Sequence, residues 1–274
     1  MEVLLRDWGC TDPVLVADTA TSRVWRVRRD GGTAIVKDLK PIGVEDELRG
    51  ADLLGWRDGR GAVWLLRRDG PTLLLEDAGP TSLLDRFEEL GDEGCTGVIL
   101  DVLDELHAPG PTAPPAALQP LVDRFASLFA QADVTGEPLI VDGAGTARRL
   151  LANQRDIRPL HGDIHHGNIH RSARGWLAID PKGLIGDRAY DIANLFYNPL
   201  GRQDLRTDLG RIGFIAAAFG ARFDRDPADV LAWAFADMCL NASWHLEDEN
   251  MARATSDLEI AARIRRVLAS VRTV

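Results

Sequence analysis

The pattern of apolar residues is mainly that of strands up to about Gly79 and that of helices beyond it, and this change limits the folds open to the chain. Before Gly79 apolar residues alternate or form short unbroken runs, as in β-strands. The predicted strands lie at 14–18, 22–30, 33–40, 62–70 and 71–79, with a predicted helix at 44–56. After Gly79 apolar residues recur at spacings of three and four, as in helices. These predicted helices lie at 82–90, 97–107, 121–132, 212–223, 229–244 and 257–271.

Strands followed by helices predict an α+β fold in two parts. We expect a small, β-rich N-terminal lobe at 1–76, a hinge at 77–80 and a larger helical lobe at 81–274. The DGG sequence at 30–32 separates two predicted strands and is typical of a hairpin turn.

Composition disfavours several classes of protein. The 274 residues are 45% hydrophobic and 27% charged, which is typical of a soluble globular chain. No run approaches the roughly 20 apolar residues of a membrane span, and the first residues lack the features of a secretory signal, so we expect a cytoplasmic protein without membrane contact. The net charge of −10 disfavours binding to nucleic acid and suits a small cationic partner. The three cysteines are too dispersed for a disulfide framework or a CxxC metal site, so we expect them to be buried.

The stretch HGDIHHGNIH, at 161–170, has two chemical interpretations. Its histidines have spacings that permit zinc binding, but two glycines disfavour the helix that would hold them together. The alternative is the pattern HxDxxxxN, formed by His161, Asp163 and Asn168, which has the spacing of a kinase-type catalytic loop. In such a loop the carboxylate receives the proton of an attacking hydroxyl, and the asparagine oxygen binds Mg²⁺. We favour the second interpretation.

Further segments supply the other parts of this chemistry. The apolar strand 176–179 ends in Asp180, which predicts a second magnesium ligand. Lys37, on a predicted strand, is suited to hold phosphate, with Glu47 on the next helix as its partner and Glu45 as the alternative. No glycine-rich loop joins the first strands. Small residues up to Ser22 would have to approach the phosphates instead.

The nucleotide base is expected where the two predicted lobes meet. There LLLEDAGPTSL runs from a strand into helical sequence, which fits a hinge whose backbone hydrogen-bonds to adenine. The candidate residues are Glu76, Asp77 and Ala78. An ordinary strand-to-helix loop is the alternative interpretation.

Longer segments resemble the aminoglycoside and hydroxyurea resistance kinases, and most of all the streptomycin 6-phosphotransferases. The likeness extends over nearly the whole chain. It is carried by HGDIHHGNIH and WLAIDPKGLIGDRAYDIANLFYNP, and upstream by VLVADTATSRVWRV, AIVKDLKPI, DELRGADLLGWRDGRGAVWLL and DRFASLFAQA.

The resemblance implies a bilobal, protein-kinase-like fold. It also implies ATP- and Mg²⁺-dependent transfer of the γ-phosphoryl group to the 6-hydroxyl of streptomycin, which gives antibiotic resistance. In this reading His161 braces the loop rather than reacting. The residues with implied roles are Asp163 as general base, Asn168 and Asp180 as Mg²⁺ ligands, Lys37 on phosphate and Glu47 on Lys37.

Streptomycin carries two guanidinium groups, so its pocket should present carboxylates. Asp191 has a second interpretation, as a brace for the catalytic loop. Asp237 lies in an apolar helix, where it is either a satisfied core residue or a pocket wall, and we favour the pocket wall. We expect Trp233 and Trp244 to belong to the core. The candidate substrate residues are Asp187, Asp191, Asp237, Glu247 and Asp248, with His165 and His166 beside the acceptor.

Two other functions compete with this one. The same fold can phosphorylate a different alcohol, because fold does not fix substrate. A catalytically silent nucleotide-binding module is the alternative from another class, and only the unusual phosphate loop favours it.

Overall fold

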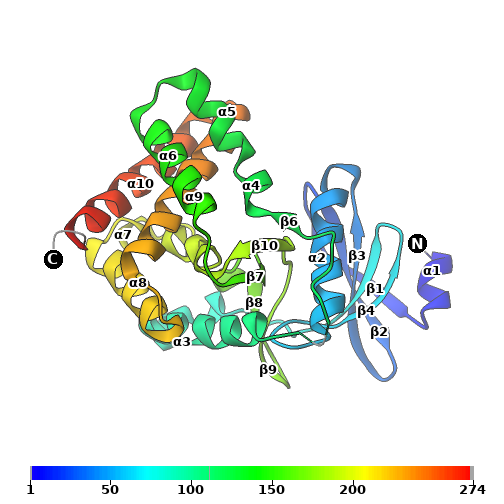
Figure 1. The fold of residues 1–274 in the computed structure, drawn as a ribbon. Helices are drawn as coiled ribbons and strands as arrows, with labels where there is room; N and C mark the ends of the chain where they lie inside the picture. Colours follow the sequence, from blue (N-terminus) through cyan, green and yellow to red (C-terminus); the bar gives the residue numbers. More distant parts are fainter. Residues whose placement is uncertain (1, 111, 272–274) are drawn as a thin grey trace.

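The computed structural model describes residues 2–110 and 112–271, which form two lobes (Figure 1). The N-terminal lobe is a five-stranded antiparallel sheet in the order β1–β2–β3–β5–β4. Helix α2 (Val44–Arg57) follows a short 3-10 turn, η1 (Pro41–Gly43), and α1 (Glu2–Asp7) lies at the N-terminal end. The strands are β1 (Thr11–Asp18), β2 (Ser22–Arg29), β3 (Gly32–Leu39), β4 (Leu65–Asp69) and β5 (Thr72–Glu76).

The predicted hairpin at DGG is confirmed. Arg29 pairs with Gly32, so two residues, Asp30 and Gly31, form the loop between β2 and β3. Both have positive φ, 49° and 77°, as the tightest right-twisting hairpins require. The hairpin places β3 at the centre of the sheet. Val36 there is fully buried.

The C-terminal lobe is helical, as predicted. Helix α9 is its centre: every residue from Val230 to Leu240 is buried, and α6, α8 and α10 lie around it (Figure 1). The helices are α3 (Phe87–His107), α4 (Leu121–Arg124), α5 (Ala126–Thr135), α6 (Pro138–Ala152), α7 (Gln203–Arg206), α8 (Leu209–Phe223), α9 (Pro227–Glu247) and α10 (Met251–Val271).

Short strands and 3-10 turns form the segments that carry the predicted site. One small sheet has the order β6–β10–β7, and a separate hairpin is formed by β8 and β9. The strands are β6 (Gln119–Pro120), β7 (Ile157–Leu160), β8 (Ile169–Ser172), β9 (Gly175–Ala178) and β10 (Leu184–Asp187). The turns are η2 (Leu84–Arg86), η3 (His166–Asn168), η4 (Arg188–Tyr190) and η5 (Ala193–Tyr197).

Three helical predictions differ from the structure in detail. The helix expected at 121–132 is split into α4 and α5 at Phe125, whose φ and ψ of −85° and 3° lie outside the helical region. The helix expected at 82–90 is a 3-10 turn followed by the start of α3, which is kinked at Gly91. The third difference is an omission, because helix α6 was not predicted at all.

The interior contains the residues expected there. Cys10, Cys95 and Cys239 are buried free thiols, and Trp233 is 1% exposed in the main core. Within residues 2–110 and 112–271, no helix is both long and apolar enough to cross a membrane.

Candidate active site

A buried lysine on the sheet forms ion pairs with helix α2 and with the segment that follows β9. Side chains alternate along a strand, so Lys37 on β3 points to the opposite face from Val36. Its ammonium lies 2.6 Å from Glu47 Oε2 on α2 and 3.0 Å from Asp180 Oδ1, beyond β9. Burial alone would lower the pKa of Lys37, but Asp180 and Glu47 raise it above its ordinary value. Lys37 is therefore a fixed cation between two carboxylates.

A cavity of about 420 Å³ opens beside Lys37, between the lobes. Ile35 and Leu75 of the sheet form one wall, and Ile179 of the other lobe faces them. The segment expected to be the hinge, residues 77–80, lines the cavity along its whole length, together with Glu76 before it. Glu76 and Ala78 thus lie beside the cavity that the sequence predicted for a nucleotide.

The carboxylate of Glu76 is occupied by contacts within the protein. It accepts a hydrogen bond from Arg174 Nε at 3.0 Å and another from the Trp64 N–H at 3.1 Å. Arg174, in the β8–β9 turn, also lies over the Trp64 ring, 3.7 Å from its centroid. These contacts fasten the β8–β9 hairpin to the sheet. No pattern in the sequence indicated this role for Arg174.

One buried carboxylate holds the HxDxxxxN loop. Asp191 accepts the N–H of His161 at 2.9 Å and that of Gly162 at 2.6 Å, and it lies 2.9 Å from His107 Nε2 on α3. Its side chain is 0% exposed. The interpretation of Asp191 as a brace is confirmed. Its predicted substrate contact is wrong, because the carboxylate is sealed from solvent and its oxygens are occupied.

His161 ties the loop to β9. Its Nδ1 accepts the N–H of Asp163 at 3.2 Å, so its Nε2 carries the proton and donates to the Ile179 carbonyl at 2.9 Å. Burial lowers the pKa of His161, although Asp191 and Asp163 act in the opposite direction. The ring is therefore a neutral structural link.

The loop carboxylate itself is held at both oxygens. Asn194 Nδ2 donates to Asp163 Oδ1 at 2.9 Å, and Asn168 Nδ2 donates to Oδ2 at 3.3 Å and to the Asp163 carbonyl at 3.0 Å. The Asp163 side chain keeps 25% exposure. A carboxylate has about four lone-pair sites, so it can still accept a proton from an incoming hydroxyl. The sequence analysis missed Asn194, whose only signal was its place shortly after Asp191.

Asn168 and Asp180 lie next to each other across the end of the β8–β9 hairpin. The Asn168 carbonyl accepts the N–H of Ile179 at 2.9 Å, one residue before Asp180. The amide nitrogen of Asn168 is used on Asp163, which leaves its amide oxygen, and the contact of Lys37 with Asp180 is made to Oδ1. Two available oxygen donors from separate segments suit the preference of Mg²⁺ for oxygen ligands.

Ser22, predicted to contact the nucleotide, is buried in the β1–β2 turn. It is 2% exposed, its N–H donates to Thr19 Oγ1 at 3.1 Å, and its carbonyl accepts the N–H of Thr19 at 2.9 Å. Lys40 strengthens the same turn by donating to Asp18 Oδ1 at 2.5 Å. The polar groups of Ser22 therefore close the β1–β2 turn, and its predicted contact with the nucleotide is replaced by this structural role.

The histidines of the loop have separate surroundings. His165 Nδ1 accepts the Gly167 N–H at 3.0 Å, and His170 Nδ1 lies 3.0 Å from the Gly79 carbonyl. His166 packs edge-on against Phe87, and burial lowers its pKa to about 4. Among residues 2–110 and 112–271, no three His, Cys, Asp or Glu side chains are grouped to hold a metal ion. His165 is 25% exposed and lies 4.0 Å from Asp163, so it stays a candidate neighbour of the acceptor.

Asp187 also differs from its prediction as a substrate residue. Both of its oxygens contact the guanidinium of Arg225, each at 3.0 Å, and they accept the N–H groups of Arg155 and Ala189. The residue is 2% exposed. Its contacts cap the turn η4 and pair a buried arginine, so the predicted substrate contact is wrong.

Asp237 is part of the core rather than a pocket wall. It is 1% exposed, accepts the Tyr190 hydroxyl at 2.9 Å and accepts Asn241 Nδ2 at 3.1 Å. Burial raises its pKa to about 6, against the influence of Tyr190 and Arg124. The sequence prediction failed here because the partner, Tyr190, is 47 residues away along the chain.

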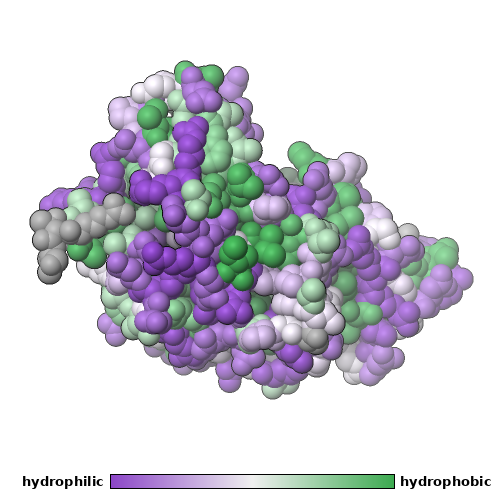
Figure 2. All heavy atoms as spheres, viewed as in Figure 1, coloured by the Kyte–Doolittle hydropathy of each residue, from purple (hydrophilic) through white to green (hydrophobic). Residues whose placement is uncertain are grey.

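A second cavity between the lobes, of about 460 Å³, is polar. Its lining includes Asp46 on α2, Asp123 and Arg124 on α4, Trp244 on α9, and Lys182. The surface is notched between α4–α5 and the sheet-bearing lobe (Figure 2). Lys182 Nζ lies 3.9 Å from Asp163 Oδ2, so one residue of the cavity lining lies beside the loop carboxylate. Trp244, expected in the core, is only partly buried and stacks on Arg124, 4.5 Å from ring centroid to guanidinium.

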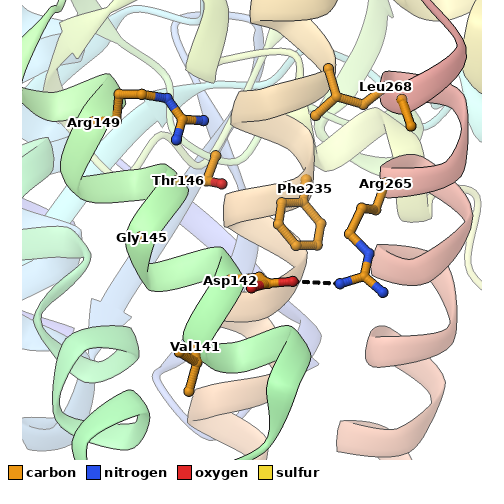
Figure 3. Close-up of a pocket in the computed structure, with 9 residues that line it drawn as sticks. Val141, Asp142, Gly145, Thr146, Arg149, Phe235, Arg265 and Leu268 are labelled. Atoms are coloured by element: carbon orange, nitrogen blue, oxygen red, sulfur yellow. Dashed lines mark hydrogen bonds and ion pairs between the residues drawn. The ribbon is translucent and has the colours of Figure 1, made fainter.

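A further cavity, of about 440 Å³, lies among α6, α9 and α10 (Figure 3). The ion pair between Asp142 and Arg265, at 2.5 Å, bridges α6 and α10 beside it. Its lining contains no residue of the HxDxxxxN loop, of the 76–80 segment or of the Lys37 cluster. The candidate site residues therefore lie at or near the two interlobe cavities and not at this one.

Comparison with known sequences gives full-length relatives. The chain is 35% identical to a streptomycin 3''-kinase of Klebsiella pneumoniae, over 89% of this chain and 98% of the relative. It is 28% identical to a streptomycin 6-kinase of Streptomyces glaucescens, over 97% of this chain and 88% of the relative.

Solved structures share the fold. The aminoglycoside phosphotransferase APH(4)-Ia, in a complex with ADP and hygromycin B, superposes with a TM-score of 0.66 at 15% identity, over 96% of this chain and 97% of the other. A choline/ethanolamine kinase family protein of Mesorhizobium loti gives 0.68 at 15% identity, over 99% and 95%. The predicted bilobal, protein-kinase-like fold is thereby confirmed. Since the sequence pattern of the aminoglycoside/hydroxyurea antibiotic resistance kinases matches residues 7–249, the chain belongs to that family.

Proposed function

We propose that this protein transfers the γ-phosphoryl group of ATP to a hydroxyl of streptomycin. The observation that carries the proposal is that residues two positions apart in the chain line the two interlobe cavities, with Asp163 beside one of them. Asp180 lines the first cavity, Lys182 lines the second, and Asp163 lies beside Lys182. A nucleotide in one cavity and an alcohol in the other would thus meet at a carboxylate that can accept a proton.

The 420 Å³ cavity is proposed as the nucleotide site. Ile35, Leu75 and Ile179 offer apolar surfaces to an adenine ring, and the backbone of the hinge around Ala78 offers hydrogen-bonding groups. Lys37, a fixed cation, would contact the phosphates. In this proposal residues 1–76 and 81–274 are the two lobes, joined by residues 77–80.

Asn168 and Asp180 would hold Mg²⁺ through the oxygens that their other contacts leave available. When bound, the ion neutralises part of the triphosphate charge. Lys37 supports this metal site, because it stays protonated and holds Asp180 in place.

Asp163 performs the proton transfer in this mechanism. The acceptor oxygen bonds to the γ-phosphorus while the bond to the bridging oxygen of ADP breaks, and the hydroxyl proton passes to Asp163. Phosphoryl transfer has a loose transition state, so the protein contributes mainly positioning and charge. Asn194, Asn168 and the braced backbone supply the positioning of Asp163.

The 460 Å³ cavity is proposed as the acceptor site. Asp46 and Asp123 present exposed carboxylates from the two lobes, and Asp46 is also paired with Arg49. Planar guanidinium groups bind carboxylates with paired hydrogen bonds. The net charge of −10 favours the approach of a cation. Glu247 extends the acidic surface near α5, because Ser127 of the cavity lining donates to it at 2.6 Å.

Lys37 allows a test of the nucleotide site with a matched control. Glu47 is 7% exposed and binds Lys37, whereas the Glu45 side chain is 89% exposed and pairs with Arg49. We expect Glu47→Gln to lower kcat/KM for ATP by about 10- to 100-fold, because a charge-assisted hydrogen bond contributes about 1.5–3 kcal/mol. Glu45→Gln should match the wild type in the same steady-state assay. Equal losses in both variants would contradict the assignment.

The function itself is tested by a phosphorylation screen. Purified protein with ATP and Mg²⁺ is offered streptomycin, other aminoglycosides and small metabolic alcohols, and ADP formation is followed. Brisk turnover of streptomycin is expected. Turnover of another alcohol without streptomycin would leave a kinase with a different acceptor, and ATP binding without any transfer would indicate a silent module.

Analysis of the product shows which hydroxyl of streptomycin is phosphorylated. The 6-hydroxyl stays our prediction from the sequence, and the 3''-hydroxyl is the second candidate, favoured by the higher identity with the Klebsiella pneumoniae enzyme. Phosphorus–proton correlation NMR of the purified product assigns the phosphate to one ring or the other. A phosphate on the streptidine ring would support the first position, and a phosphate on the 3'' carbon would replace it.

A further inference from the structure

Lys182 belongs to the lining of one interlobe cavity and lies close in the chain to the lining of the other. It lies two residues after Asp180, which lines the proposed nucleotide site, and its own side chain lines the proposed acceptor site. Its ammonium is 3.9 Å from Asp163 Oδ2, and the side chain is 27% exposed. A cation at this position is beside the path that a phosphoryl group would follow.

The backbone at Lys182 is held on several sides. Its N–H donates to the His161 carbonyl at 2.7 Å, and the carbonyl of Gly183 accepts the N–H of Gln119 at 3.0 Å. Gly183 has a φ of +66°, and a Cβ there would lie 2.4 Å from the Arg49 carbonyl of α2. Only glycine permits this close approach of α2 to the backbone at residue 183. The root of the Lys182 side chain is thus fixed, while its four-carbon stem remains able to turn.

The ammonium of Lys182 is held less tightly than that of Lys37. Lys37 is buried between Glu47 and Asp180 at 2.6 and 3.0 Å. Lys182 has its carboxylate contact with Asp163 at 3.9 Å, beyond the usual length of a hydrogen bond. An ammonium has three donors, so Lys182 can engage phosphate oxygens while it stays near Asp163. Lys37 therefore suits permanent binding, and Lys182 suits a contact that forms when a nucleotide with a γ-phosphoryl group is bound.

We propose that Lys182 is a second catalytic cation, which contacts the γ-phosphoryl oxygens as the group passes from ADP to the acceptor. This inference rests on the proposed phosphotransfer. In the step, the acceptor oxygen bonds to phosphorus, the bridging oxygen leaves on ADP with its electron pair, and the acceptor proton goes to Asp163. The proposed task of Lys182 is to stabilise charge on the transferred group.

The test compares two nucleotides that differ at the γ-position. With Mg²⁺ present, Lys182→Met should weaken binding of the ATP analogue AMP-PNP by about tenfold, which is the loss of one charge-assisted hydrogen bond. Binding of ADP should stay within about twofold, because ADP has no γ-phosphoryl group. Isothermal titration calorimetry measures both. Lys182→Arg keeps the charge and should restore most of the AMP-PNP affinity.

Turnover supplies the second readout. Lys182→Met should lower kcat by about a hundredfold, the scale for removing one preorganised donor to developing charge. Equal changes in ADP and AMP-PNP affinity, or a kcat within about threefold of wild type, would overturn the inference, since a group that only supports the fold or Asp163 does not distinguish the two nucleotides. The binding comparison needs no acceptor. A wild-type protein that fails to phosphorylate streptomycin would therefore contradict the proposed function without deciding the role of Lys182.

Discussion

Replacement of Asp163 by alanine is expected to lower turnover by at least about a hundredfold, the usual scale for loss of a catalytic base. The residue holds the only loop carboxylate that is both fixed by Asn194 and Asn168 and open to the cleft at 25% exposure. Nucleotide affinity should change little, because Lys37 and the 420 Å³ cavity are intact in this variant. Steady-state kinetics and calorimetry with ADP measure the two quantities separately.

Asp133→Ala is the control for this change, because Asp133 is an acid on α5 with a side chain that is 77% exposed. Its kcat should equal that of the wild type. Turnover of Asp163→Ala near the wild-type level would remove Asp163 from the role of base. Loss of ADP binding would show instead that the substitution had damaged the nucleotide site.

Replacement of Asp191 by alanine should have the largest effect on stability. Three donors would lose their acceptor in the core: the N–H groups of His161 and Gly162, and the ring of His107. Each unsatisfied buried group costs about 1–3 kcal/mol, so we expect the free energy of unfolding to fall by about 3 kcal/mol or more. Urea unfolding followed by circular dichroism measures this change.

Activity of the folded Asp191 variant should also fall, because the backbone that positions Asp163 loses its support. The surface variant Asp133→Ala again serves as control and should stay within about 0.5 kcal/mol of wild type. A loss of activity without any loss of stability would point to direct participation of Asp191 in catalysis. Unchanged stability and activity would show that Asp191 does not brace the loop.

The sequence predicted the parts of this molecule that depend on local patterns. Alternation and turn chemistry located the β2–β3 hairpin, and the helical spacing after Pro41 located α2. Motif spacing located Asp163, Asn168 and Asp180 because these residues act within two adjacent loops. Glu47 was preferred over Glu45, and the structure places Glu47 against Lys37.

Helix α6 escaped prediction because its sequence contradicts helical propensity. It contains Gly143 and Gly145, each of which disfavours a helix by about 1 kcal/mol relative to alanine. Packing explains the first of them: a Cβ on Gly143 would lie 2.5 Å from Cys239 Cβ of α9. A tertiary contact thus selected a residue that local reasoning counts against the helix.

The acidic residues were the least predictable part of the site. A sequence shows that a carboxylate is present, but its partner decides whether it meets substrate or supports the fold. Asp191 is bound to His107 across 84 positions, and Asp187 to Arg225 across 38. Those pairings seal both residues. The carboxylates left exposed beside the acceptor cavity, Asp46 and Asp123, had no distinguishing pattern.

The central claim is that Asn168 and Asp180 join Lys37 in holding a metal-bound nucleotide between the lobes. Crystals grown with AMP-PNP and Mn²⁺ test it most directly, because manganese scatters anomalously and binds oxygen ligands as Mg²⁺ does. We predict an anomalous peak at about 2.0–2.4 Å from the Asn168 amide oxygen and an Asp180 carboxylate oxygen, with the triphosphate reaching Lys37. A peak bound to other side chains, or a nucleotide outside the 420 Å³ cavity, would contradict the account.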